Sequence, residues 1–188
     1  MPMKNLFLVL LCWSLLWIAC SSNEAPQKVL PPGPTASTDS LSAAPEDRPA
    51  ILFFGNSLTA AYGIDPDSGF VSLIQQRLDS LEWPYQTINS GNSGETTAGG
   101  NSRIDWVLSQ QAFDFFILEL GGNDGLRGIA PTDSYRNLKS IIDKVLAADS
   151  TIQIVLAGME APPNLGSEFT QAFRENYRRL AQEYELPL

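Results

Sequence analysis

Short apolar runs alternate with stretches of helical periodicity through most of the chain. Four runs have the length of β-strands, at residues 50–54, 85–89, 115–120 and 151–157. Between and after them, apolar residues recur at helical spacing at 68–81, 102–110, 131–146 and 168–185. Ser68 could cap the first of these helices, and Pro131 stands where a first helical turn tolerates proline. The pattern predicts an α/β domain.

This alternation also predicts where a binding site would lie. Strands that alternate with helices form right-handed βαβ units, and hence a parallel sheet with helices on both faces. Ligands bind such sheets beyond the carboxyl ends of the strands. Three glycine-rich segments follow predicted strands, at 55–57, 90–100 and 121–125. We therefore expect these three loops to meet at one edge of the sheet and to form an active site.

The first 48 residues lack this alternation. Residues 1–20 have the pattern of an export signal, with Lys4 as the only positive charge before an apolar run too short to span a bilayer comfortably. The run ends at Ala19-Cys20-Ser21, which resembles a bacterial lipoprotein signal in which Cys20 becomes lipidated. An ordinary signal peptide with a chance cysteine is the alternative. Residues 21–48 are rich in proline and serine and are predicted to be a disordered tether.

Composition excludes several kinds of partner and cofactor. The 188 residues include 12 basic and 21 acidic residues, giving a formal net charge of −9, and no histidine. Nothing resembles the basic stripe that nucleic acid requires, so we expect no nucleic acid partner. Both cysteines, Cys12 and Cys20, precede the domain, so a zinc site within it would need carboxylates alone. We expect no metal and no cofactor.

The candidate chemistry lies in the three loops. Ser57 follows the first predicted strand and opens a helical turn, where adjacent N–H groups point toward developing negative charge. A serine there is, by itself, more often a helix cap. The segment 121–123 changes that balance, because its glycines let a ligand approach the backbone and the Asn123 amide can donate to an oxyanion. Gly94 could add a backbone N–H. Glu119 and Asp124 are expected to brace the third loop by hydrogen bonds rather than to act as acid or base.

Together these segments resemble the SGNH (GDSL-type) hydrolase family, closest to its thioesterase I/lysophospholipase and arylesterase branch. The resemblance runs from about residue 49 onward and rests on three blocks, GNSL at 55–58, NSGNSGET at 89–96 and ELGGNDGLRG at 119–128. It implies a three-layer, flavodoxin-like parallel sheet, the SGNH hydrolase fold. It also implies Ser57 as nucleophile, and an oxyanion hole made by the backbone N–H groups of Ser57 and Gly94 with the Asn123 amide. Asn56 departs from the aspartate of the family's name-giving motif, but an amide keeps the size and one acceptor.

The same resemblance implies a histidine that this sequence lacks. The family's fourth block, Asp-x-x-His after a fifth strand, supplies the base and the carboxylate that orients it. Here the sequence reaches Pro187 and Leu188 where a fifth strand would begin. We therefore expect residues 49–188 to be a domain whose final strand and helix are missing, and this fragment to be nearly inactive. A binding module that has lost its base is the alternative.

The expected function of the full-length protein is hydrolysis of small acyl esters or thioesters through an acyl-enzyme on Ser57. The N-terminal segment predicts that the protein is exported to the bacterial cell envelope, either to the periplasm or as a membrane-anchored lipoprotein. The membrane would then be a partner through the lipid anchor. A carbohydrate acetylesterase of the same fold is the alternative enzyme. The loops at 60–69 and 158–167, which would contact the substrate, fit an acyl chain no better than a sugar.

Overall fold

The computed structural model describes residues 48–188, so the predicted export signal, Cys20 and nearly all of the tether lie outside the described residues. The elements, in chain order, are β1 (Ala50–Gly55), η1 (Pro66–Ser68), α1 (Phe70–Ser80), β2 (Gln86–Gly91), α2 (Thr97–Gln110), β3 (Phe115–Glu119), α3 (Gly122–Arg127), α4 (Pro131–Ala148), β4 (Gln153–Leu156), η2 (Pro163–Leu165) and α5 (Ser167–Tyr184). Among these helices, none has the length and apolar character needed to cross a bilayer.

The four strands form one parallel sheet in the order β2-β1-β3-β4. This order belongs to the flavodoxin-like class of doubly wound folds. The register sets the strand ends level, because Gly55 at the end of β1 lies opposite both Gly91 of β2 and Glu119 of β3. The three loops that follow these strands therefore leave the sheet side by side, as the sequence predicted.

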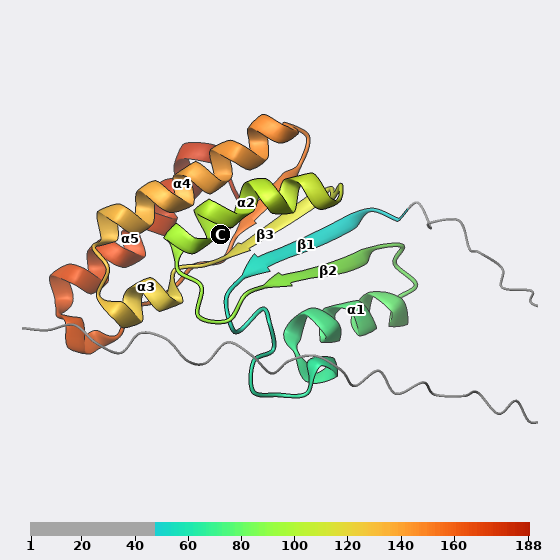
Figure 1. Ribbon diagram of the computed structural model, residues 1–188, viewed down its shortest axis with the longest axis horizontal. Coiled ribbons are helices and arrows are strands. Elements are labelled where there is room, and N and C mark those ends of the chain that lie inside the picture. The colour runs from blue at the N-terminus through green and yellow to red at the C-terminus, as the bar shows by residue number, and fades with distance from the viewer. Residues whose placement is uncertain (1–47) are drawn as a thin grey trace, which may run out of the picture. The chain divides into compact units, whose positions relative to one another are not determined.

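Helices cover the sheet on both faces, which confirms the predicted three-layer α/β fold. Figure 1 shows α2, α4 and α5 on one side of the sheet and α1 on the other. The larger core lies under the group of three helices, where alternate strand residues such as Leu52, Phe54 and Phe116 are buried. On the α1 side, Phe53 packs edge-on against Phe70 at 5.7 Å between ring centroids. Burial along β1 is therefore nearly continuous, with only Ile51 partly exposed, because helices cover the strand on both faces.

Two predicted helix boundaries were wrong. Ser68 does not cap α1; it ends η1, and Gly69 precedes the helix without a side-chain cap. Helix α2 begins at Thr97, five residues before the predicted start, and the hydroxyl of Thr96 accepts the Gly99 N–H at 3.3 Å. The two glycines in the first turn of α2 have low helix propensity, which explains the late prediction. Gly100 is required by packing, since a Cβ there would lie 2.3 Å from Leu120 Cδ1.

Candidate active site

The turn after β1 holds the candidate nucleophile. Residues 56–62 form one helical turn, in which the Ala60 N–H donates to the Asn56 carbonyl and the Tyr62 N–H to the Ser57 carbonyl, both at 3.0 Å. Asn56 shapes the start of this turn, because its Oδ1 accepts the Leu58 N–H at 2.9 Å. The Ser57 hydroxyl lies 3.4 Å from the same oxygen, a long and weak hydrogen bond, and the residue is half-buried. Ser57 therefore sits at the sheet edge with a hydroxyl that its neighbours hold only loosely.

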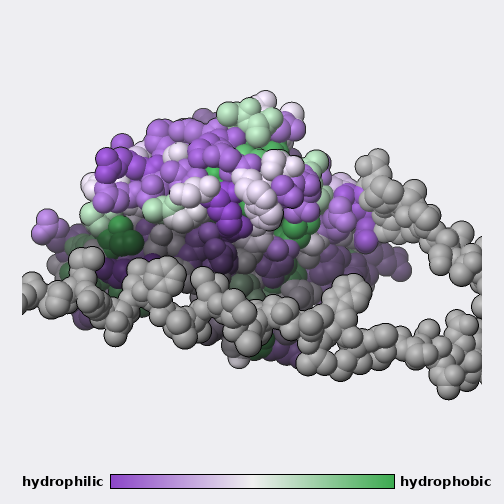
Figure 2. Space-filling model, in the orientation of Figure 1, coloured by the Kyte–Doolittle hydropathy of each residue, from purple (hydrophilic) through white to green (hydrophobic). Residues whose placement is uncertain are grey.

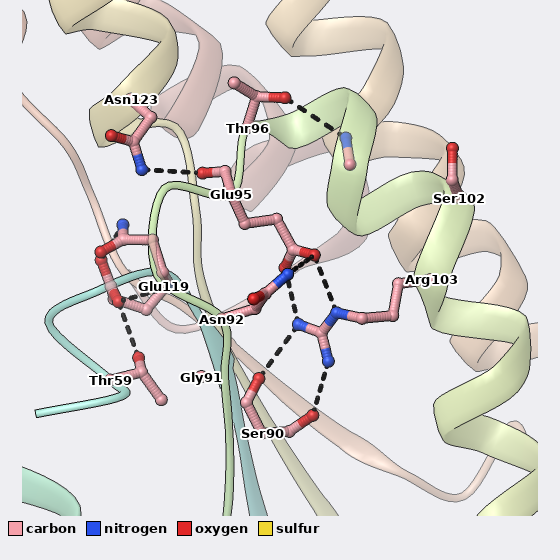
Figure 3. A network of polar contacts seen from close by, with 12 residues as sticks. Thr59, Ser90, Gly91, Asn92, Glu95, Thr96, Ser102, Arg103, Glu119 and Asn123 are labelled. Carbon is pink, nitrogen blue, oxygen red and sulfur yellow. Dashed lines mark hydrogen bonds and ion pairs between the residues drawn. The ribbon is translucent and has the colours of Figure 1, made fainter. Parts of the chain in front are cut away.

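Glu119, at the end of β3, braces this turn from below. Its buried carboxylate accepts the Asn56 side-chain amide at 2.8 Å, the Asn56 N–H at 3.3 Å and the Thr59 hydroxyl at 2.7 Å. Figure 3 shows the Thr59 contact. Gly55 makes room for this arrangement, since a Cβ there would lie 2.1 Å from Thr59 Oγ1. Glu119 is a brace, as expected, but it braces the turn after β1 and not the third loop, and it acts on Ser57 through Asn56.

The loop after β2 presents the second candidate donor. The Glu95 N–H donates to the Asn92 carbonyl at 3.1 Å and closes a β-turn around Gly94. Gly94 has φ +79°, which the third position of a type II turn requires and which favours glycine. The Asn92 N–H donates to the Gly55 carbonyl at 2.9 Å, so this loop is fastened to the end of β1. Gly94 itself is exposed.

The segment after β3, predicted to be a glycine-rich loop, forms a short helix, α3. Its glycines hid it: Gly121 precedes α3 with φ +115°, and Gly122 opens the first turn. Asn123, in this first turn, donates from its amide to the Glu95 carbonyl at 2.9 Å (Figure 3). Because an amide nitrogen carries two hydrogens, one remains for a ligand.

Asp124, the next residue, is buried and structural. Its carboxylate accepts the Thr97 N–H at 2.9 Å and the Ser134 hydroxyl at 3.1 Å. It therefore ties α3 to the start of α2 and to α4, as the bracing interpretation expected. Within residues 48–188 no group of three or more metal-binding side chains occurs.

The three loops are joined in pairs by these contacts. Asn92 links the second loop to the first, Asn123 links the third to the second, and Glu119 links the end of β3 to the first. Over the described part of the chain, no hydrogen bond engages the backbone N–H of Ser57 or of Gly94. Free backbone N–H groups and an amide hydrogen, on loops at the sheet edge that carries the serine hydroxyl, are the kind of donors that stabilise an oxyanion in acyl transfer. The catalytic assignment of Ser57, Gly94 and Asn123 stays a prediction.

The structure adds a group that the sequence analysis missed. Glu95 and Arg103 form a bidentate ion pair behind the Gly94 loop, and Arg127 of α3 donates to the Gly94 carbonyl at 3.0 Å. The sequence gives no signal for the pair. The two residues are eight positions apart across a helix cap, and although Glu95 lies in the block at 89–96, nothing in the sequence pairs it with Arg103.

Comparison with known proteins decides the family. The sequence model of the GDSL-like lipase/acylhydrolase family matches residues 53–188. The chain belongs to this family. It is 37% identical over 138 residues to the esterase TesA of Pseudomonas aeruginosa, covering 73% of this chain and 68% of TesA. It is 34% identical over 148 residues to an arylesterase of Vibrio mimicus, covering 79% of this chain and 73% of that protein.

Solved structures agree with the family and the fold. AlinE4, described as an SGNH-hydrolase family esterase, superimposes with a TM-score of 0.72 at 40% identity, and the match covers 76% of this chain and 75% of AlinE4. The predicted membership of the SGNH family is confirmed. The α/β fold with its four-stranded parallel sheet matches these hydrolase structures.

The Glu119 brace makes a prediction about stability and pH. Burial raises the pKa of the Glu119 carboxyl above its ordinary value, against the lowering effect of its hydrogen bonds from Thr59 and Asn56. The native state then binds more protons than the unfolded state above the ordinary pKa, so this carboxyl makes the free energy of unfolding fall as pH rises. Glu119→Gln removes that dependence. It also places the NH₂ group of glutamine opposite a donor of Asn56 or Thr59, and the lost hydrogen bond costs about 1–3 kcal/mol.

Urea unfolding of the wild type and Glu119→Gln between about pH 5 and pH 8 measures both effects. We expect the variant to be less stable throughout, with the difference largest at the acid end. Glu168→Gln, an exposed carboxyl on α5, is the control and should change little. A difference that grows with pH would contradict the raised pKa.

Proposed function

We propose that this protein is a carboxylic ester hydrolase that forms an acyl-enzyme on Ser57. The observation that carries the proposal is the junction of three loops at one sheet edge, where the N–H groups of Ser57 and Gly94 have no hydrogen-bond partner among residues 48–188. Family membership supports the same reaction, because TesA is named an esterase and the protein of Vibrio mimicus an arylesterase.

The proposed chemistry has two steps. Ser57 Oγ attacks the ester carbonyl carbon, and the negative charge that develops on the carbonyl oxygen is stabilised by the N–H groups of Ser57 and Gly94 and by the Asn123 amide. Collapse of the tetrahedral intermediate expels the alcohol and leaves the acyl group on Ser57. Water then attacks the acyl-enzyme and releases the acid.

Both steps need a base that accepts the proton of the attacking oxygen. The 188 residues contain no histidine. Among the described residues, Glu119 is the carboxyl connected to Ser57 by the fewest hydrogen bonds. The connection runs through the Asn56 side chain, which cannot relay a proton in its ordinary amide form. We therefore expect a polypeptide of these 188 residues to hydrolyse esters slowly, with its nucleophile and oxyanion hole formed. An added base should then raise the rate.

Imidazole tests this directly. We expect p-nitrophenyl esters of short acyl chains to be hydrolysed faster in the presence of imidazole and protein together than the sum of either alone. A series of chain lengths, a matching thioester and acetylated xylan then rank the substrate classes. Hydrolysis of the xylan in preference to every simple ester would favour the carbohydrate acetylesterase. Binding of an ester analogue without any protein-dependent rate at any imidazole concentration would favour the binding module and contradict the proposal.

We also propose that the protein is exported and held in the bacterial cell envelope through a lipid on Cys20. This rests on the sequence of residues 1–20 and on the proline-rich tether to the domain. Mass spectrometry of the protein expressed from its own leader should find an acylated Cys20 at the mature N-terminus. A Cys20→Ala variant should lose the lipid and leave the membrane fraction. A mature protein that retains residues 1–19 would contradict the proposal.

A further inference from the structure

We propose that Arg103 and Glu95 are a positioning pair that fixes both of the oxyanion donors supplied from outside the Ser57 turn. The inference rests on the proposed function. It concerns two residues that touch no substrate and that act through the Gly94 loop.

The pair is bidentate and largely buried. Arg103 Nε donates to Glu95 Oε1 at 2.8 Å and Arg103 Nη2 to Glu95 Oε2 at 2.6 Å. The Glu95 side chain is only 3% exposed and that of Arg103 20%. Two parallel charge-assisted hydrogen bonds fix the direction as well as the distance of the carboxylate. A carboxylate this buried depends on its partner, because removing one member of such a pair leaves an uncompensated charge.

Arg103 is itself held by the sheet. Its guanidinium donates to the hydroxyl of Ser90 at 2.9 Å and to the carbonyl of Ser90 at 3.0 Å, at the end of β2. The guanidinium carbon lies 4.1 Å from the ring centroid of Phe54 on β1. Figure 3 shows the side chain reaching from α2 across to Ser90 and Glu95. A planar fork and a stacking face are properties of arginine that lysine lacks.

Glu95 connects the ion pair to the candidate site. Its carboxylate also accepts the Asn92 amide at 3.0 Å, and its N–H closes the turn on Asn92, so both ends of the turn around Gly94 are held by one residue. Its carbonyl accepts the Asn123 amide at 2.9 Å. A shift of Glu95 would therefore move the Gly94 N–H and the Asn123 amide together. Loss of about 1 Å of alignment in such donors can cost about 100-fold in rate.

The role predicts a particular kinetic effect. The donors meet full negative charge only in the transition state, so their misplacement lowers kcat and leaves KM nearly unchanged. With imidazole at a fixed concentration, we expect the maximal Ser57-dependent rate to fall about 10-fold in Arg103→Lys and about 100-fold in Arg103→Met, with KM within about twofold. Ethylguanidinium should restore part of the rate to Arg103→Ala by refilling the guanidinium site.

Lys144→Met is the matched control. Lys144 reaches the same helix from α4, donating to Asp105 Oδ2 at 2.8 Å and to the Asn101 carbonyl at 2.9 Å, without touching the Gly94 loop. The Lys144→Met substitution removes a cationic contact to α2 and should leave kcat unchanged. Ethylguanidinium should have no effect on it. An equal loss of rate in Lys144→Met and Arg103→Met would show that loosening α2 suffices, and would overturn the positioning role.

Hydrogen–deuterium exchange of the peptide covering residues 91–96 gives a readout that needs no catalysis. We expect exchange of this loop to be faster in Arg103→Met than in the wild type or Lys144→Met. Unchanged exchange, or faster exchange with an unchanged kcat, would overturn the proposal. A wild type without any Ser57-dependent rate would instead contradict the proposed function, and the exchange data would still show whether the pair holds the loop.

Discussion

Replacing Gly121 with alanine is expected to lower the free energy of unfolding by more than about 3 kcal/mol. Two separate effects add at this position. Its φ of +115° is a conformation that residues with a Cβ rarely adopt, and a Cβ there would lie 1.9 Å from the hydroxyl oxygen of Tyr177. Gly121 directly precedes α3, so the same change displaces Asn123 from the candidate site.

Tyr177 cannot move aside cheaply. It is 2% exposed, packs edge-on against Phe173 at 5.7 Å, and donates to the Leu120 carbonyl at 2.9 Å. Burial raises the pKa of the Tyr177 hydroxyl, so it stays protonated and keeps its donor role. Displacing the ring would break this hydrogen bond and disturb the core beneath α5.

Two further variants separate backbone strain from overlap. Gly63 has φ +82° and nothing within 4 Å of a Cβ, so Gly63→Ala measures strain alone, about 1–2 kcal/mol. Tyr177→Phe removes the overlapping oxygen and leaves the ring, whose nearest atom, Cζ, lies 3.3 Å from the Cβ position. In a double-mutant cycle, Gly121→Ala should therefore cost less in the Tyr177→Phe background. Equal costs for Gly121→Ala and Gly63→Ala would contradict the explanation, as would a cycle without coupling.

The sheet and the convergence of its loops could be predicted from the sequence because they follow from local patterns. Apolar runs such as 50–54 and the helical spacing of 131–146 gave the alternation, and the alternation gave a parallel sheet with level strand ends. Glycine-rich stretches were harder, since low helix propensity hid both the start of α2 and the whole of α3. Position 100 of α2 requires glycine because a Cβ there would collide with Leu120, and this contact joins residues twenty positions apart in the sequence.

The candidate nucleophile and oxyanion donors could be named because they lie in motifs that directly follow strands. The residues that hold them could not be named. Glu95 and Arg103 matter through a side-chain pairing that depends on how α2 lies over the end of β2, and a single sequence does not encode that orientation in any spacing. Glu119 was expected to be a brace of the third loop, and the structure shows that it braces the first, with Asn56 and Thr59 as its donors.

Replacing Ser57 with alanine is expected to abolish the imidazole-assisted rate while leaving the fold intact. Among residues 48–188 the hydroxyl makes one long hydrogen bond, to Asn56 Oδ1 at 3.4 Å, so the free energy of unfolding should change by less than about 1 kcal/mol. The rate should fall at least about 100-fold, to that of imidazole in buffer. A general base contributes about 10²–10⁴-fold, and in the variant imidazole has no serine hydroxyl to deprotonate.

Imidazole must be present in this comparison. The members of a catalytic triad act as a unit, so removing the serine from a protein that already lacks the base can cost little. Without imidazole, similar slow rates for the wild type and Ser57→Ala would say nothing about the nucleophile. Ser102→Ala is the matched control: Ser102 is exposed on α2 and donates to the Ala98 carbonyl at 3.0 Å, and it should retain the full imidazole-assisted rate.

The acyl-enzyme itself is the most direct test of the central claim. The protein would be incubated with a p-nitrophenyl ester and imidazole, quenched in acid, digested and analysed by peptide mass spectrometry. Because p-nitrophenolate is a much better leaving group than the Ser57 alkoxide, acylation should be faster than deacylation and the intermediate should accumulate. We predict one acyl group, on the peptide that contains Ser57, present in Ser102→Ala and absent in Ser57→Ala. Protein-dependent release of p-nitrophenol with no acyl group on Ser57, or with the label on another residue, would contradict the account.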